Sequence, residues 1–169
     1  MTDAKGNIPV HIGEIKKHSI ENGDGIRVSV FISGCPHRCK GCHNPEAWAY
    51  DFGEVYTEAV KEEILSACAP DYIDGLTLLG GEPMAPHNVL ASLDLSKNMK
   101  KRYPEKTIWL YTGYTMEELK ERKSETVDQI LDLVDVIVDG RFEEDLKVVD
   151  LPFRGSTNQR IIRKEETPN

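Results

Sequence analysis

Short apolar runs alternate along this chain with longer stretches of helical periodicity. In the run at residues 28–34, apolar and small polar residues alternate, while the other runs are more continuously apolar. Runs of this length, bounded by turn-forming residues, are typical of strands. They predict strands at residues 10–15, 28–34, 75–79, 107–112 and 136–139.

The first predicted helix lies between the strands at residues 28–34 and 75–79. Thr57 is a predicted N-cap for a helix over residues 58–68. Within it, Val60, Ile64 and Cys68 repeat every four residues and so share one face. This spacing predicts that Cys68 is a small buried hydrophobe and not a metal ligand.

The later helices carry boundary signals of their own. Pro86 is expected to open a helix that Pro104 closes, with three apolar residues facing the core: Val89, Leu90 and Leu93. Two further helix starts are predicted from capping-box patterns, at residues 115–118 and 126–129.

Strands that alternate with helices predict an α/β fold with a mainly parallel sheet and right-handed crossovers. The length of 169 residues suits a single domain over residues 1–169, but it is too short for eight βα units, which need about 250 residues. We therefore expect an open, partial (βα) barrel. Functional residues in such folds gather at the carboxyl ends of the strands.

Three of the four cysteines lie in one such loop. Cys35, Cys39 and Cys42 follow the strand at residues 28–34 with the spacing C-x3-C-x2-C. Three cysteines leave one iron of a [4Fe-4S] cluster open to a substrate, whereas a structural zinc ion normally has four ligands. The spacing therefore favours a cluster over zinc.

Two other interpretations of these cysteines remain open on spacing alone. Either His37 or His43 could supply a fourth ligand to zinc. Residues 39–43 also match the C-x-x-C-H pattern of haem attachment, although that pattern leaves Cys35 unexplained and requires export.

A second motif lies at the end of the next predicted strand, where Gly80, Gly81, Glu82 and Pro83 form a G-G-E-P run. Alone, this run is typical of a turn between a strand and a helix. Together with the upstream cysteines it resembles the radical S-adenosylmethionine superfamily. The resemblance implies that the cysteines hold a [4Fe-4S] cluster and that the G-G-E-P strand end contacts the methionine amino group of S-adenosylmethionine.

The same resemblance implies a set of cofactor-contacting residues. A carboxylate and backbone carbonyls accept hydrogen bonds from an ammonium, and glycine lets the backbone approach a ligand closely. A side chain at Gly81 is accordingly expected to block binding. His43 is a possible replacement for the aromatic residue that many superfamily members carry where Gly41 stands. The expected contacts to S-adenosylmethionine are Gly41, His43, Gly80, Gly81, Glu82 and Thr112.

Motifs in the C-terminal third of the chain resemble one family within this superfamily. The D-G-R-F run at residues 139–142, the R-G-S-T-N-Q run at residues 154–159 and the W-L-Y-T-G-Y run at residues 109–114 are similar to motifs of the activating enzymes of anaerobic ribonucleoside-triphosphate reductase. That family installs a glycyl radical on the reductase by means of a 5′-deoxyadenosyl radical. We expect Arg154 and Asn158 to contact this partner, although both could equally stabilise a closing strand.

Charge and hydrophobicity limit which partners and which cellular location are expected. The 21 basic and 29 acidic residues give a net charge of −8, which argues against a nucleic-acid partner. Residues 1–7 do not form a signal peptide, and no apolar run reaches membrane-spanning length, so we expect a cytoplasmic protein. A one-electron donor such as flavodoxin is expected. The alternatives are another small radical enzyme, such as a different glycyl-radical activase or a 7-carboxy-7-deazaguanine synthase type, and a zinc-binding adaptor.

Overall fold

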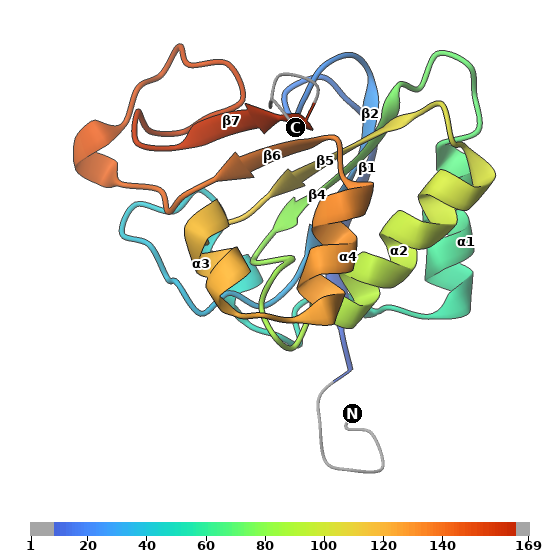
Figure 1. Cartoon of the computed structure of the whole chain (residues 1–169), viewed down its shortest axis with the longest axis horizontal. Helices are drawn as coiled ribbons and strands as arrows, with labels where there is room; N and C mark the ends of the chain where they lie inside the picture. The colour runs from blue at the N-terminus through green and yellow to red at the C-terminus, as the bar shows by residue number, and fades with distance from the viewer. Residues whose placement is uncertain (1–8, 165–169) are drawn as a thin grey trace.

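The computed structural model describes residues 9–164, so the polar segment at residues 1–7 lies outside the described residues. Within this range the strands form one open sheet in the order β3-β1-β2-β4-β5-β6-β7 (Figure 1). The strands are β1 (His11–Ser19), β2 (Arg27–Ile32), β3 (Glu54–Val55), β4 (Gly75–Gly80), β5 (Thr107–Tyr111), β6 (Val136–Asp139) and β7 (Arg160–Arg163).

The centre of the sheet is parallel and its edges are antiparallel. Strands β2, β4, β5 and β6 run in one direction, whereas β1 pairs antiparallel with β2, and β7 pairs antiparallel with β6. The expectation of an open, partial barrel with a mainly parallel sheet is confirmed. Because the four central strands are parallel, their carboxyl ends meet at one edge and bring four loops together.

The helices are α1 (Glu58–Ala67), α2 (Val89–Arg102), α3 (Met116–Glu121) and α4 (Glu125–Leu133), with short 3₁₀ turns η1 (Pro45–Trp48) and η2 (Glu144–Leu146). Helices α1, α2 and α4 lie side by side along the sheet (Figure 1). The hydroxyl of Thr57 caps α1 as predicted, and Thr115 forms the predicted capping box with Glu118. The second predicted capping box is wrong, because α4 is capped two residues earlier, by Ser124.

Helix α2 differs from its prediction at the start. It begins at Val89 after Asn88, and the turns between Pro83 and Asn88 precede it, so Pro86 does not open the helix. Leu90 is 71 % exposed and does not face the core, whereas Val89 and Leu93 are buried. The buried side of α2 includes Leu95 and Met99, and at about 100° per residue Leu90 lies on the opposite side of the helix.

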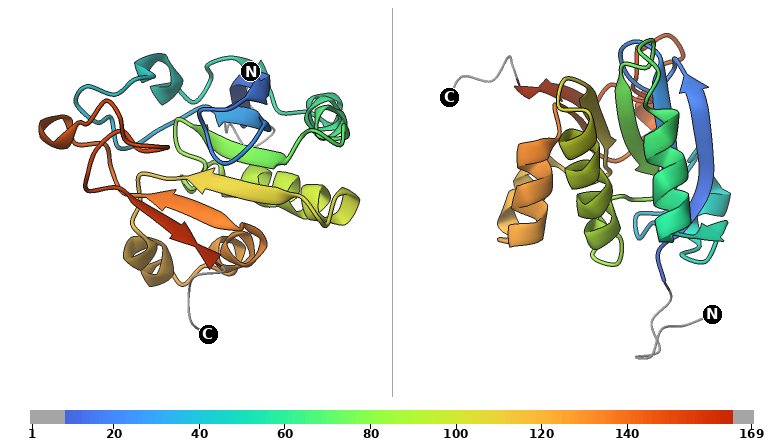
Figure 2. Two further views of the ribbon diagram at one scale, coloured as in Figure 1. Left: turned by 90° about the horizontal axis from the view of Figure 1, so that it is seen from above. Right: turned by 90° about the vertical axis from the view of Figure 1, so that its right-hand side faces the viewer.

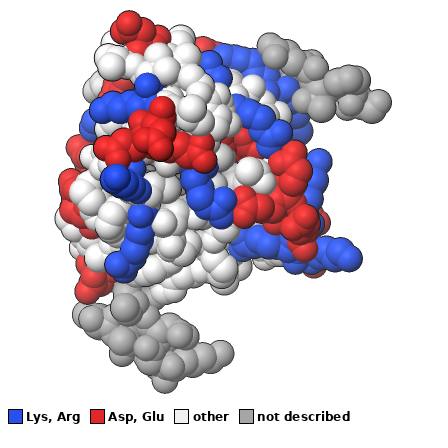
Figure 3. Space-filling model, turned by 90° about the vertical axis from the view of Figure 1, so that its left-hand side faces the viewer, with Lys and Arg blue, Asp and Glu red and all other residues white. Residues whose placement is uncertain are grey.

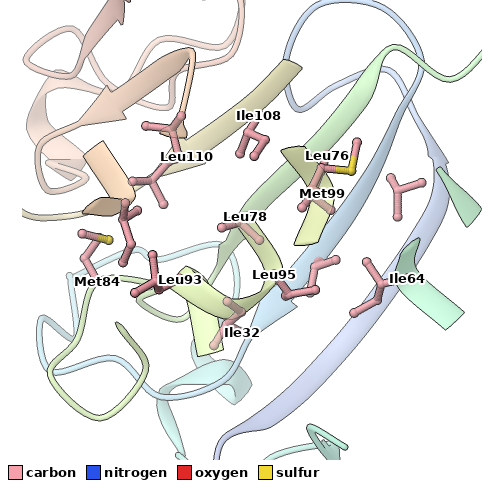
Figure 4. Packing of buried hydrophobic residues seen from close by; sticks show 14 of the residues in the cluster. Ile32, Ile64, Leu76, Leu78, Met84, Leu93, Leu95, Met99, Ile108 and Leu110 are labelled. Atoms are coloured by element: carbon pink, nitrogen blue, oxygen red, sulfur yellow. The ribbon is translucent and has the colours of Figure 1, made fainter. Parts of the chain in front are cut away.

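The main core lies between the sheet and these helices. Alternate residues of the parallel strands, such as Leu76, Leu78, Ile108 and Leu110, pack against apolar residues of the helices (Figure 4). Cys68 belongs to this core and is fully buried, and burial raises the pKa of its thiol to about 11. The prediction that Cys68 is a buried hydrophobe is confirmed.

The other face of the sheet is the interior of the partial barrel. Figure 2 shows how the last strand and the loop before it curve round on this side. A second apolar cluster here joins Trp109, Val136 and Val138 to Phe153. At the amino-terminal end, Arg27 is 1 % exposed and donates hydrogen bonds to Thr77 and to Thr107. Arg27 thus stabilises this end of the barrel, far along the strands from the cysteines.

Candidate active site

The cysteine loop is attached to the sheet by backbone hydrogen bonds. The amides of Gly34 and Cys35 donate to the carbonyls of Ala47 and Trp48, at 2.7 and 3.2 Å, so η1 closes the loop. Gly34 has a φ of +101°, and a Cβ at this position would lie 2.0 Å from the ring of Tyr50. Only glycine fits at this turn, because both the backbone conformation and the available space exclude a side chain.

The three cysteines of the loop are free thiols that differ in how deeply they are buried. Cys35 is 8 % exposed, while Cys39 and Cys42 are half-buried. Burial raises the pKa of the Cys35 and Cys39 thiols, which favours their neutral form until a metal displaces the proton. Within residues 9–164, no three His, Cys, Asp or Glu side chains converge closely enough to hold a single metal ion. A cluster distributes its three cysteines over three irons, so its ligands need not meet at one point.

Glu82 is the centre of a buried hydrogen-bond network. Its side chain is fully buried and accepts four hydrogen bonds. Oε1 accepts from His37 Nε2 at 2.8 Å and from the Gly113 amide at 2.6 Å. Oε2 accepts from the Met84 amide and from the Thr112 hydroxyl, both at 2.8 Å. The carboxylate therefore binds together the cysteine loop, its own turn and the end of β5, and these protein donors occupy its acceptor sites.

His37 extends this network to the tail. Arg141 Nε donates to His37 Nδ1 at 3.2 Å, so the proton of a neutral ring lies on Nε2, which donates to Glu82. The ring also packs edge-on against Tyr114, with the ring centroids 4.5 Å apart. Arg141 in turn makes two hydrogen bonds to Glu118, each 2.9 Å long, and they lower the pKa of that carboxyl to about 2. Residues from the loops after β4, β5 and β6 thus hold the cysteine loop in place.

A cavity of about 440 Å³ opens beside the three cysteines. Its walls include Gly80 and Gly81 at the end of β4, Thr112 and Gly113 after β5, and His43 beside the ring of Phe142. It continues into the barrel over apolar side chains of the strands: Phe31, Leu79 and Val138. This volume is in the range of small-molecule and cofactor sites.

Three residues that line the cavity each carry a buried polar atom with no hydrogen-bond partner among the described residues: Trp48 Nε1, the Tyr111 hydroxyl and Arg154 Nε. A buried polar atom without a partner costs free energy, so native proteins rarely keep one without a ligand or water to satisfy it. All three groups can donate a hydrogen bond. Unsatisfied donors therefore lie just behind the cavity wall, and a small movement of these side chains would let them donate to a ligand with acceptors, such as S-adenosylmethionine.

The structure brings most of the predicted site residues to this cavity. Gly41 and the side chain of Glu82 are not among the wall residues: Gly41 is exposed beside Glu144, and Glu82 lies behind Thr112 and Gly113. Gly81 is also constrained by packing, which the sequence did not predict. A Cβ there would lie 2.6 Å from the Gly34 carbonyl oxygen, so a side chain would displace the cysteine loop whether or not a ligand is bound.

The tail segment, residues 140–159, is folded largely on itself. Gln159 accepts from the amides of Gly155 and Ser156 and donates to the Gly140 carbonyl, while Asn158 donates to the Arg141 carbonyl. Figure 3 shows acidic and basic side chains interspersed on this side of the molecule. Arg160, the first residue of β7, pairs with Glu117 and with Asp139. Arg154 instead lines the cavity.

Sequence reasoning missed His37 as a positioning residue, as well as Tyr111 and Arg141. His37 was considered only as a zinc ligand, although its place between Cys35 and Cys39 ties it to the cysteine loop. A signal for Tyr111 was present in the alternation of β5, where Ile108 and Leu110 face the core and Trp109 faces the barrel interior. No local pattern identifies Arg141, because its partners are 23 and 104 residues away.

Comparisons with known proteins agree with this geometry. Residues 21–162 match the family described as 4Fe-4S single cluster domain. The chain is 42 % identical over 147 residues to the anaerobic ribonucleoside-triphosphate reductase-activating protein of Pasteurella multocida, an alignment that covers 85 % of this chain and 91 % of the relative. It is 42 % identical over 140 residues to the protein of that name from Enterobacteria phage T4, with 83 % and 85 % covered.

The protein of that name from Escherichia coli K12 is 39 % identical over 144 residues, which cover 84 % of this chain and 91 % of the relative. No helix in the described part of the chain is long and apolar enough to cross a membrane. The family match spans residues 21–162, a range that includes every residue lining the cavity. This chain therefore belongs to the 4Fe-4S single cluster domain family and to the family of anaerobic ribonucleoside-triphosphate reductase-activating proteins.

Proposed function

We propose that this protein is a radical S-adenosylmethionine enzyme that installs a glycyl radical on an anaerobic ribonucleoside-triphosphate reductase. One observation carries the proposal: the three cysteines, the Gly80–Gly81 turn and the Thr112–Gly113 turn line a single cavity at the carboxyl edge of the parallel strands. The relatives that share 39 to 42 % of its sequence are activating proteins of that reductase. We propose that this cavity is where the chain carries out the function of these relatives.

The residues present fit both cofactors. Cys35, Cys39 and Cys42 would hold a [4Fe-4S] cluster, and Cys68 is separated from them by the core. Gly80, Gly81, Thr112 and His43 line the space for S-adenosylmethionine. When bound, the reduced cluster and S-adenosylmethionine supply a 5′-deoxyadenosyl radical that can take a hydrogen atom from a glycine.

The protein supplies position and exclusion of water. Glu82 fixes Thr112 and Gly113 relative to the cysteine loop, because one carboxylate accepts from both and from His37. A buried and fully satisfied network of this kind holds its members in one geometry. The apolar walls at Phe31, Leu79 and Val138 keep water from the inner part of the cavity.

The partner and the electron donor follow from the same proposal. The tail segment borders the cavity and exposes apolar side chains, with Val149 88 % exposed, while Asn158 is exposed beside it. We propose that the glycine loop of the reductase reaches the cavity along this border and that Asn158 contacts the partner. A one-electron donor such as flavodoxin would reduce the cluster.

The test combines the anaerobically reconstituted protein with the reductase, S-adenosylmethionine and a chemical reductant. We expect an organic radical in the paramagnetic resonance spectrum of the reductase, and oxygen should then cleave the reductase chain at the radical glycine. A variant with all three cluster cysteines replaced by Ala should give no radical. Colourless protein that binds zinc and forms no radical would support the zinc-binding adaptor instead.

A further inference from the structure

The first residues of the tail segment contact the cysteine loop at three points. One contact is a hydrogen bond of 3.2 Å, one joins two rings whose centroids lie 5.1 Å apart, and one is an ion pair of 3.8 Å. Each pairs a residue of the tail segment with a residue beside one of the cysteines: Arg141 with His37, Phe142 with His43, and Glu144 with Lys40. These contacts keep residues 141–144 next to all three cysteines.

Two of these tail residues act on the sulfur of Cys39. Burial raises the pKa of the Cys39 thiol, whereas a hydrogen bond from the Phe142 amide and the nearby positive charge of Arg141 both lower it. The attraction is mutual: after the hydrogen bonds to Glu118, the Cys39 thiolate is one of the groups that raise the pKa of Arg141. The start of the tail segment therefore stabilises negative charge on this cysteine.

The guanidinium of Arg141 is fixed between Glu118 and the cysteine loop. Nη1 and Nη2 donate to the two carboxylate oxygens of Glu118, each at 2.9 Å, while Nε donates to His37 Nδ1. Arg141 lines the cavity together with the three cysteines, whereas Glu118, on α3, is not one of the wall residues. The positive member of this ion pair is thus the one that borders the cysteines.

We propose that Arg141 raises the reduction potential of the [4Fe-4S] cluster. The inference rests on the proposed function, which places the cluster on the three cysteines, and it adds a residue outside the cysteine and G-G-E-P motifs. Reduction transfers one electron from the donor to the cluster and breaks no bond, so the negative charge of the cluster and its thiolates increases by one. A fixed positive charge and hydrogen bonds to the sulfurs stabilise the more negative state and therefore raise the potential.

The potential decides what fraction of the cluster a given donor can reduce. Without Arg141, a donor of fixed potential would reduce a smaller fraction of the protein. Because the side chain of Arg141 is 43 % exposed, water and dissolved ions screen its charge, so its effect on the potential should fall as the salt concentration rises. This dependence on salt distinguishes a charge effect from a change in the shape of the cysteine loop.

The experiment measures the midpoint potential of the cluster in the anaerobically reconstituted protein, without S-adenosylmethionine and without the reductase. Dithionite and redox mediators set the solution potential, and the paramagnetic resonance signal of the reduced cluster reports the reduced fraction. The variants are Arg141→Ala and Arg141→Lys. Arg102→Ala is the matched control, because Arg102 forms the same two hydrogen bonds to a glutamate, Glu62, but is exposed on α2 and does not line the cavity.

The Arg141→Ala variant should have a lower midpoint potential than the wild type. At a fixed solution potential, we expect the ratio of reduced to oxidised cluster to fall about tenfold, which corresponds to about 59 mV for a one-electron couple. Raising the salt concentration from about 0.1 M to about 1 M should shrink this difference, because the Debye length falls from about 10 Å to about 3 Å. The control should have the potential of the wild type.

Arg141→Lys separates the charge from the shape of the side chain. Lysine keeps the positive charge but cannot form the two-bonded fork with Glu118, so its midpoint should lie closer to that of the wild type than to that of Arg141→Ala. Iron and sulfide are measured in every sample, and only fully loaded protein is compared. If Arg141→Ala does not hold a complete cluster, Arg141→Gln, which is also neutral but keeps hydrogen-bond donors, replaces it under the same criteria.

Three results would overturn the proposal. One is a change of less than twofold in the ratio of reduced to oxidised cluster when Arg141 is replaced by a neutral residue. The others are equal potentials for the neutral and the lysine variants, or a loss that does not depend on salt, because either would assign the shift to a displaced cysteine loop. If the wild-type protein assembles no [4Fe-4S] cluster, the proposed function fails. If it assembles one whose potential does not depend on Arg141, only this inference fails.

Discussion

Replacing Glu82 by Gln tests the hydrogen-bond network behind the cavity. Gln has the shape of Glu but only one acceptor oxygen, whereas Glu82 accepts two hydrogen bonds at each oxygen. The Thr112 hydroxyl can turn round and accept from the new amide. The backbone amides of Met84 and Gly113 cannot, and they face different oxygens. Whichever way the Gln side chain points, one of these amides is left buried without an acceptor.

His37 cannot adapt to the variant by accepting a hydrogen bond from the Gln side-chain amide at the Oε1 position. If its Nε2 became an acceptor, the proton would move to Nδ1 and face the Arg141 Nε–H group, which now donates to that nitrogen. The variant therefore loses at least one hydrogen bond to a charged group, and it leaves a buried donor unsatisfied. We expect Glu82→Gln to lower the free energy of unfolding by about 3 kcal/mol.

Urea unfolding of the metal-free protein under anaerobic conditions measures this loss at neutral pH. The variant should shift the midpoint with the slope unchanged, since the slope reports the surface exposed on unfolding. Glu62→Gln is the matched control, because Glu62 is exposed and pairs only with surface groups. A loss below about 0.5 kcal/mol for Glu82→Gln would refute the network, since surface substitutions commonly produce changes of that size.

Three further predictions follow from the site. Replacing any one of the cluster cysteines by Ala should abolish bound iron and sulfide after anaerobic reconstitution, whereas Cys68→Ala should keep both; iron loss in the Cys68 variant alone would reverse the assignment. Gly81→Val should reduce iron content as well as S-adenosylmethionine binding, because its side chain would collide with the Gly34 carbonyl; normal iron with lost binding would show that the variant blocks only the approach of the ligand. Arg141 lowers the pKa of Glu118 to about 2, so this pair stabilises the fold above the ordinary carboxyl pKa near 4.5 and is lost as the pH falls towards 2. Glu118→Gln should therefore reduce the difference in unfolding free energy between pH 6 and pH 3, by less than about 1 kcal/mol because the pair is partly exposed, and an unchanged difference would contradict the pairing.

Much of the fold could be predicted because its signals are local. The parallel strands are short apolar runs, and Thr57 and Thr115 cap their helices through atoms three residues away. The prediction for Leu90 was wrong because Leu90 lies opposite the side of the helix that Leu95 and Met99 bury. The predicted start at Pro86 was also wrong, because a proline permits a helix start without requiring one. The chain uses Asn88 instead, whose side chain donates to the carbonyls of Ser33 and Glu82 and so joins the two motif loops.

The cysteines could be predicted from their spacing, but the role of Glu82 could not. A carboxylate after two glycines is consistent with a direct contact to an ammonium, and only the fold brings His37, Thr112 and Gly113 to it from 45, 30 and 31 residues away. The position of Arg154 at the cavity could not be predicted either, because it too depends on the fold. A polar run such as residues 154–159 does not indicate which of its side chains turns inward.

The measurement that tests the central claim most directly follows a hydrogen atom. The reductase is produced with glycine deuterated at its α carbon and is then incubated anaerobically with this protein, S-adenosylmethionine and a chemical reductant. We expect the 5′-deoxyadenosine that is released to carry one deuterium by mass spectrometry, in proportion to the radical formed on the reductase. Radical formation with 5′-deoxyadenosine free of deuterium, or no radical despite a complete cluster, would contradict this expectation.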